Sequence, residues 1–333
     1  MFLLNNIKRL FFNFVKQSFL LRIFLFSYLL LGQNFNRVDA TVCTYSSKIN
    51  NTNELAKKID NDFSNDLDKV RALYIYLTHN IEYDLNEYKY GADNYSFRYS
   101  SKEELEKQIR QRDLKIIHKT LYRKKAICEG YSMAFKEVCG ILDINCVVIS
   151  GYTRTISSEI GKLPLEGRHA WNAVYINSKW RFIDTTWGAG YSRDSEHWIK
   201  SYDEHYFFTP PKELITTHFP EEKKWQLVAS SKTETQFTNQ PLYSSLFFNE
   251  GIELVSPKDG IIDSHKEFLI LKLKNVKPDV EFGYAFEKDY YLTSIIPEYK
   301  KNNATLRIPL KGKNNTTLNI LSGTEMVLQF QIP

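Results

Sequence analysis

One stretch, residues 125–190, constrains the fold more than any other part of the chain. It begins KAICEGYSMAFKEVCG, whose apolar residues recur at helical spacing, so we expect a helix that starts within a residue or two of Cys128. After a buried strand (INCVVISGYTR) and a loop come RHAWNAVYI and KWRFID, which favour a β-hairpin about Asn177-Ser178. Together with an earlier amphipathic helix over residues 52–80, this order indicates an α+β core.

His169 and Asp184 fall near the two ends of that hairpin. If Asn177-Ser178 forms a two-residue turn, Trp171 lies opposite Asp184, and His169 is its diagonal neighbour on the same sheet face. Diagonal neighbours are about 7–8 Å apart, which is within reach for a long side chain. A shift of one residue would put the two side chains on opposite faces, and Asn-Ser is a weaker turn signal than Asn-Gly.

Cys128 stands where the helix is expected to begin. The thiolate is the nucleophilic form of cysteine, and it is favoured by a helix N-terminus and by a histidine that takes up the proton. An imidazole oriented by a carboxylate can do this, and the N–H of Cys128 could help to bind an oxyanion. The sequence therefore predicts a nucleophilic triad of Cys128, His169 and Asp184. Taken singly, each residue also has an ordinary structural explanation, as a buried thiol, a core histidine or a turn cap.

The remaining cysteines and histidines point to packing rather than to a metal. A zinc site built from Cys128, Cys139 and His169 is disfavoured, because no short C-x-x-C or H-x-H spacing is present. We expect no metal and no cofactor, and we expect Cys139 and Cys146 to be buried. If the chain is exported, one disulfide among Cys43, Cys139 and Cys146 is compatible with a free nucleophile. The other histidines are expected in loops or at the surface: His79, His118, His197, His205, His218 and His265.

Beyond residue 245 the pattern changes to short alternating strands. GIELVSP, EFLILKLKN, VEFGYAFE, ATLRIPLKG, TTLNIL and EMVLQFQIP are separated by turn residues and show no helical period. This is typical of an antiparallel β-sandwich, here over residues 246–333. It is immunoglobulin-like (Ig-like) in architecture only, because the Cys…Trp…Cys spacing of antibody domains is missing. Residues 229–245, rich in Ser, Thr, Asn and Gln, are expected to form a linker.

Residues 1–40 have the composition of a targeting segment. A basic stretch without acids, an uncharged run (IFLFSYLLLG) and a small residue at Ala40 favour a secretory signal peptide. The run is shorter than the roughly 20 apolar residues of a membrane span. We therefore expect a secreted protein or one of the secretory pathway. A membrane anchor and a cytoplasmic chain are the alternatives, and membrane contact is expected only through residues 1–40 if they stay uncleaved.

The charge of the chain gives no support for nucleic-acid binding. The formal net charge is +5, but residues 1–40 carry five basic residues and one acidic residue, which leaves +1 for the remainder. Long basic runs are also missing. The expected partner is instead a protein or peptide substrate.

Several motifs carry a family resemblance. AICEGYSMAF, CVVISGY, HAWNAV and W-x-FIDTTWGAG resemble the transglutaminase-like superfamily of papain-type cysteine enzymes, and more narrowly its kyphoscoliosis peptidase branch. The preceding DLDKVRALYIYLTHNIEYD and the following YFFTPPKELITTHFPEEKKWQLV and FFNEGIELVSP are similar to the flanking regions of that branch. The resemblance covers about residues 60–260. It implies a transglutaminase-like (papain-like) catalytic domain over residues 52–228, with helices packed on an antiparallel sheet.

The resemblance also implies a role for each member of the triad. Cys128 is then the nucleophile, His169 the base, and Asp184 the residue that orients the base. Two departures are mild: Ala126 stands where members commonly have glycine, and Thr185 where they usually have alanine.

The expected function is that of a thiol enzyme. The Cys128 thiolate would attack a peptide or glutamine side-chain carbonyl to give a thioester, which water or an amine then resolves. Hydrolysis by a cysteine peptidase is favoured over cross-linking by an acyltransferase, because features of a calcium-dependent transglutaminase are missing. The other alternative is a catalytically silent transglutaminase-like scaffold or binding module.

Overall fold

The computed structural model describes residues 34–91, 95–163, 165, 167–192, 194 and 196–333. The chain divides into two compact units, Met1–Tyr45 and Ser46–Pro333. In the first, the described part contains α2 (Asn36–Val42), and most of the predicted signal peptide lies outside the described residues. Among the helices that the structure describes, none is long and apolar enough to cross a membrane.

Two helices, rather than the single predicted one, occupy residues 52–80. In α3 (Thr52–Asp62) and α4 (Asp66–Asn80), an asparagine caps the N-terminus of each, Asn51 and Asn65, by accepting a first-turn N–H. Phe63 between them is extended, at φ −134° and ψ 131°, which ends α3. α4 is buried on all sides from Val70 to Thr78, so it forms a core helix rather than an amphipathic surface helix.

A long surface helix, α6 (Lys102–Arg123), precedes the central segment. Its cap is Ser101, whose hydroxyl accepts the N–H of Glu104. Between α4 and α6 lie β1 (Glu82–Tyr83) and α5 (Leu85–Tyr90). β1 pairs in parallel with β2 (Lys125–Ala126), which leads directly into the next helix.

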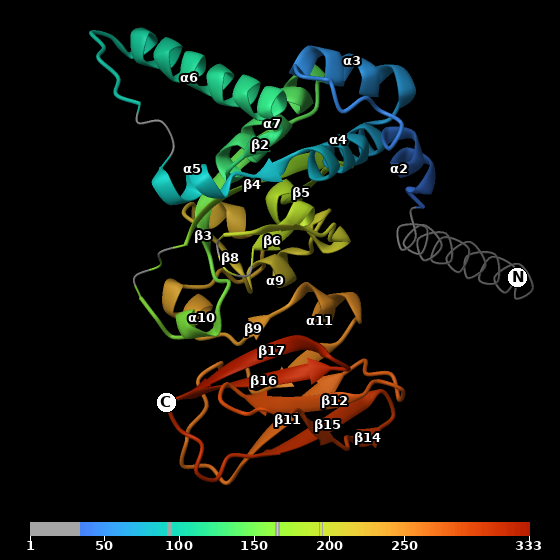
Figure 1. Ribbon diagram of the computed structural model, residues 1–333, viewed down its shortest axis with the longest axis vertical. Helices are drawn as coiled ribbons and strands as arrows, with labels where there is room; N and C mark the ends of the chain where they lie inside the picture. Colours follow the sequence, from blue (N-terminus) through green and yellow to red (C-terminus); the bar gives the residue numbers. More distant parts are fainter. Residues whose placement is uncertain (1–33, 92–94, 164, 166, 193, 195) are drawn as a thin grey trace, which may run out of the picture. The chain divides into compact units, whose positions relative to one another are not determined.

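The core is a four-stranded antiparallel sheet covered by α7 (Cys128–Ile141) (Figure 1). α7 begins at Cys128, within the predicted range. The predicted hairpin is also confirmed: Ile176 pairs with Lys179, and Asn177 and Ser178 have positive φ values of 52° and 60°. Across the layers, the Asn172 side chain donates to the Ser132 carbonyl of α7. The strand order is β5 (Lys179–Ile183), β4 (Arg168–Ile176), β3 (Cys146–Thr153), β8 (His218–Pro220).

Short elements fill the connections around this sheet. They are η1 (Ser157–Glu159), α8 (Thr185–Ala189), β6 (Gly190–Ser192), β7 (Trp198–Lys200), η2 (Glu204–Tyr206), α9 (Pro211–Leu214), η3 (Lys223–Gln226) and α10 (Glu234–Thr238).

The C-terminal region is the predicted antiparallel β-sandwich, drawn in orange and red in Figure 1. One sheet contains β10 (Glu253–Ser256), β11 (Phe268–Lys274), β15 (Asn303–Pro309) and β14 (Glu298–Lys300). The other contains β13 (Thr293–Ile295), β12 (Phe282–Phe286), β16 (Thr316–Ser322), β17 (Glu325–Ile332) and β9 (Leu242–Tyr243). Alternate residues of β11, at 269, 271 and 273, point into a shared apolar core. α11 (Ser245–Asn249) joins β9 to β10.

The segment predicted as a linker, residues 229–245, contains regular structure. α10 buries Phe237 completely, and β9 pairs with β17 of the sandwich. The buried guanidinium of Arg154, just after β3, donates to the carbonyls of Thr238 and Gln240. These bonds attach the segment to the central sheet, while the boundary at residues 228/229 stays a prediction.

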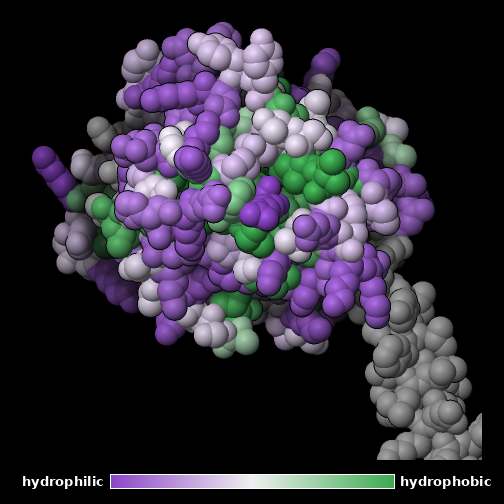
Figure 2. Space-filling view, turned by 90° about the horizontal axis from the view of Figure 1, so that it is seen from below, coloured by the Kyte–Doolittle hydropathy of each residue, from purple (hydrophilic) through white to green (hydrophobic). Residues whose placement is uncertain are grey.

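The surface seen from below in Figure 2 is mostly hydrophilic, with a patch of hydrophobic side chains near its middle. Large apolar side chains are also exposed in the sandwich. The most exposed of them are Tyr290, Tyr291 and Ile296.

Candidate active site

Asp184 is the centre of a buried hydrogen-bond cluster. It follows β5 and caps α8, where its Oδ1 accepts the N–H groups of Thr186 at 2.8 Å and Trp187 at 2.9 Å. Its Oδ2 accepts from His169 Nε2 at 2.6 Å and from His218 Nε2 at 3.0 Å. Four donors therefore satisfy a carboxylate that is only 2% exposed.

His169 meets Asp184 as the hairpin register predicts. It is the second residue of β4, and the ladder that pairs Asn172 with Ile183 brings Asp184 to the same face. The Cys128 side chain lies near enough to the same imidazole to help raise its pKa. Since Nε2 is bound to Asp184, Nδ1 is the ring nitrogen left for the thiol.

The charges of this cluster follow from burial and contact. Burial alone would lower the pKa of His169, but the Asp184 carboxylate outweighs it and, with a contribution from Cys128, raises the pKa to about 10. Burial would likewise raise the pKa of Asp184, but its contacts with His169 and His218 hold that pKa well below the usual range. At neutral pH the pair is thus an imidazolium and a carboxylate.

His218 corrects the sequence prediction, which placed it in a loop or at the surface. It is the first residue of β8 and is 1% exposed. Its Nδ1 contacts the Thr217 hydroxyl at 2.9 Å. Burial lowers the pKa of His218 to about 4, because Asp184 offsets the desolvation only in part and the charge of His169 opposes a second cation. His218 is therefore neutral where His169 is charged.

A glycine in β3 explains how β8 comes close enough to bring His218 to Asp184. Gly151 of β3 pairs with His169 on one side and with Pro220 of β8 on the other. A Cβ at this position would lie 2.3 Å from the Phe219 carbonyl oxygen and 2.6 Å from the Trp171 ring. Only glycine allows this close approach. This approach of β8 to β3 has little local signal in the sequence, because it joins segments more than 60 residues apart.

Aromatic rings enclose the two histidines. Trp187 lies 4.5 Å from His218 between ring centroids, and Trp171 lies 5.1 Å from His218 and 6.0 Å from His169. These rings keep water away from the ion pair, which strengthens its electrostatic interaction.

The Cys128 end of the site is more open. Cys128 is half-buried, and Ile127, the residue before α7, makes no side-chain cap. Ile127 therefore leaves the first-turn N–H groups of α7 without a side-chain cap, and N–H groups at the start of a helix favour an anion. Within the described residues, which include all four cysteines, every thiol is free. Cys139 is buried as predicted, whereas Cys146, at the start of β3, is half-buried and corrects that prediction.

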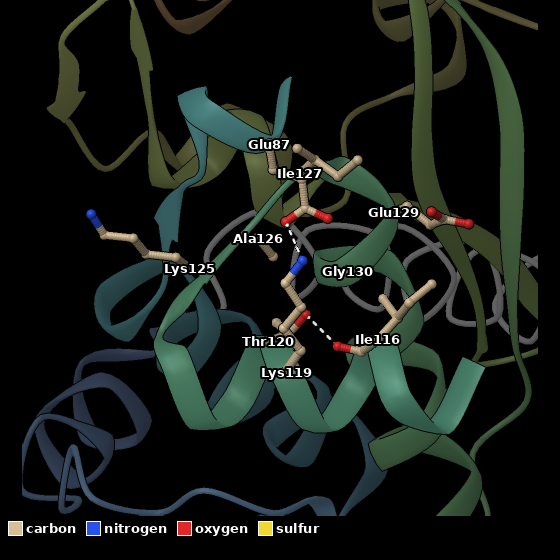
Figure 3. Close-up of a pocket in the computed structure, with 9 residues that line it drawn as sticks. All are labelled: Glu87, Ile116, Lys119, Thr120, Lys125, Ala126, Ile127, Glu129 and Gly130. Carbon is tan, nitrogen blue, oxygen red and sulfur yellow. Dashed lines mark hydrogen bonds and ion pairs between the residues drawn. The ribbon is translucent and has the colours of Figure 1, made fainter. Parts of the chain in front are cut away.

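A small pocket lies beside the start of α7 (Figure 3). Its volume of about 10 Å³ has room for about one water molecule. Lys119 of α6 and Glu87 of α5 form an ion pair of 3.1 Å across it. A Cβ on Gly130 would meet the Thr120 hydroxyl at 2.4 Å, so this glycine lets α6 approach α7. The lining residues are Glu87, Ile116, Lys119, Thr120, Lys125, Ala126, Ile127, Glu129 and Gly130.

His169, Asp184 and His218 also have the composition of a metal-binding group. Their contacts fit hydrogen bonds better. The two nitrogens lie 2.6 Å and 3.0 Å from one oxygen, whereas two ligands of a tetrahedral zinc with bonds of about 2.0–2.1 Å are about 3.3 Å apart.

Comparisons with known proteins show which family and which relatives the chain resembles. Residues 53–185 match the family model described as the transglutaminase-like superfamily. The chain is 30% identical over 230 residues to kyphoscoliosis peptidase of Mus musculus, which covers 68% of this chain and 32% of that protein. The Homo sapiens protein of the same name is 29% identical over 232 residues, covering 69% and 32%. Hillarin of Drosophila melanogaster is 33% identical over 147 residues, covering 40% and 18%.

The chain spans about a third of the length of the two peptidases that it matches. Residues 53–185 are therefore a transglutaminase-like domain, and the similarity of the chain to kyphoscoliosis peptidase is consistent with the kyphoscoliosis peptidase-like branch.

Proposed function

We propose that this chain is a cysteine-type hydrolase of protein amide bonds, with Cys128 as nucleophile, His169 as general acid and base, and Asp184 as its counter-ion. The observation that carries this proposal is the buried His169–Asp184 ion pair, which adjoins a half-buried cysteine at the start of a helix. A histidine without a nearby thiol, or a buried thiol without a base, would not support it.

The chemistry follows from the positions of the three side chains. The Cys128 sulfur attacks the carbonyl carbon, and the oxyanion is stabilised by N–H groups at the start of α7. His169 then gives its proton to the leaving amine as the C–N bond breaks, which leaves a thioester on Cys128. The neutral imidazole takes a proton from water, whose oxygen attacks the thioester and releases the acid and the thiol.

A proteolysis assay with an unstructured substrate tests this function. Casein incubated with the protein is expected to give new peptides, and Cys128→Ser is expected to abolish them by removing the thiolate. A parallel reaction contains dansylcadaverine, a primary amine. Fluorescent casein without new peptides would show acyl transfer and would contradict the proposed hydrolysis. No product together with an unreactive Cys128 would support the silent scaffold.

We propose further that residues 1–40 direct the chain to the secretory pathway, on the strength of their basic and apolar composition. Edman sequencing of secreted material is expected to begin at Thr41. A start at Met1 would rule out cleavage near Ala40.

A further inference from the structure

We propose that His218 is a positioning residue that fixes the Asp184 carboxylate, and through it the His169 imidazole. This inference rests on the proposed function, since it assigns a fourth member to the same site. His218 follows α9, and the sequence predicts only a loop or surface position for it.

The contacts of Asp184 show why a second histidine matters. Backbone N–H groups hold Oδ1, but they leave Oδ2 to side chains. With His169 as its only partner, Oδ2 would be held by the group that it has to orient. His218 is instead fixed independently, because β8 pairs with β3 and Trp187 packs against its ring. Its Nε2 therefore gives Oδ2 a fixed position.

The hydrogen bonds also define the protonation state of His218. An ionised carboxylate only accepts, so Nε2 of His218 carries a proton. In the neutral ring Nδ1 then accepts. Its partner is the Thr217 hydroxyl at 2.9 Å, which donates to this nitrogen in preference to the Leu214 carbonyl at 3.4 Å. Both ring nitrogens are satisfied in this tautomer. His218 is thus kept as a neutral donor and does not replace His169 as the charged partner of Asp184.

Two substitutions separate the hydrogen bond from the bulk of the ring. His218→Gln keeps an amide N–H that can reach Oδ2, whereas His218→Leu fills the space without a donor. His205→Leu is the matched control, because His205 is a half-buried histidine nearby whose ring stacks on Phe248. Near-UV circular dichroism and thermal melting establish that each variant is folded.

The first readout is the rate at which iodoacetamide modifies Cys128 at pH 6.5. We expect His218→Leu to lower this rate about tenfold or more, as loss of a group that orients a site residue commonly does. His218→Gln is expected to stay within about threefold of the wild type, and His205→Leu to match it. A folded Leu variant at the wild-type rate, or a folded Gln variant as slow as the Leu variant, overturns the proposal.

The second readout needs no activity. In ¹⁵N-labelled resting protein, the Nε2–H resonance of His169 is expected to be retained in the Gln variant and broadened or lost in the Leu variant. If the Leu variant does not fold, loss of this resonance from the folded Gln variant overturns the proposal. If wild-type Cys128 is unreactive, the proposed function fails while this resonance still tests the role of His218.

Zinc addition tests the competing interpretation of the cluster. The resonances of both histidines are expected to be unchanged by micromolar Zn²⁺. If instead they shift together and the alkylation of Cys128 stops, the cluster is a metal site and the positioning role is wrong.

Discussion

Replacing Asp184 with asparagine is expected to slow the reaction of Cys128 with iodoacetamide at pH 6.5 by about 10²–10⁴-fold. The upper figure is the effect of the same substitution in serine-protease triads. The amide keeps the backbone bonds at Oδ1 but turns its NH₂ group toward two imidazole N–H groups. His169 then loses its counter-ion, and burial alone lowers its pKa, so that it no longer stabilises a thiolate.

Asp194 provides the control for this variant. It forms a hydrogen-bonded pair of 2.7 Å with His197, but both side chains are exposed. Asp194→Asn is expected to leave the rate unchanged. If Asp184→Asn folds and reacts as fast as the wild type, the ion pair has no role in activating Cys128.

The same ion pair is expected to make stability fall as the pH rises above neutrality. The folded pKa of His169 is about 10, against about 6.5 when unfolded, so the folded state holds this proton more tightly. The stabilisation is complete below about pH 6.5 and is lost as the pH approaches about 10. The expected loss is a few kcal/mol in the free energy of unfolding, measured by urea denaturation across this range.

His218 changes the free energy of unfolding with pH in the opposite direction. Its pKa is about 4 when folded, so the unfolded chain takes up the proton first as the pH falls from about 6.5. This residue therefore costs stability between about pH 6.5 and 4.

In Asp184→Asn, the decline in stability above neutral pH that His169 causes is expected to disappear. An equal decline in wild type and variant would show that other groups cause it.

The hairpin and the start of α7 were predictable because their signals are local. A two-residue turn fixes the register, and the register alone places His169 beside Asp184. The start of the helix at Cys128 follows from the apolar spacing after it. The alternation of apolar and polar residues in β11 likewise predicts a strand of the sandwich, since such a strand buries every second residue.

Features set by long-range contact were not predictable in this way. His218 looks like a loop residue until β8 pairs with β3 across Gly151. The division of residues 52–80 into two helices has a local cause instead: Asn65 caps a second helix, and the continuous apolar pattern hides this signal. α10 lies in a polar segment, and the one large apolar residue of the helix itself, Phe237, is buried. The amino-acid composition of a segment does not reveal a single buried side chain of this kind.

The chain contains its own reference for the reactivity of Cys128. Cys43 is exposed and stands for an ordinary thiol, while Cys139 is buried. Mass spectrometry after brief iodoacetamide treatment of the folded protein at pH 6.5 measures the extent of modification of each cysteine in one sample. We expect Cys128 to be modified faster than Cys43 in the wild type, and this order to reverse in His169→Ala. Modification of Cys128 no faster than that of Cys43, or a rate unchanged in the folded His169→Ala variant, would contradict a Cys128–His169–Asp184 nucleophile.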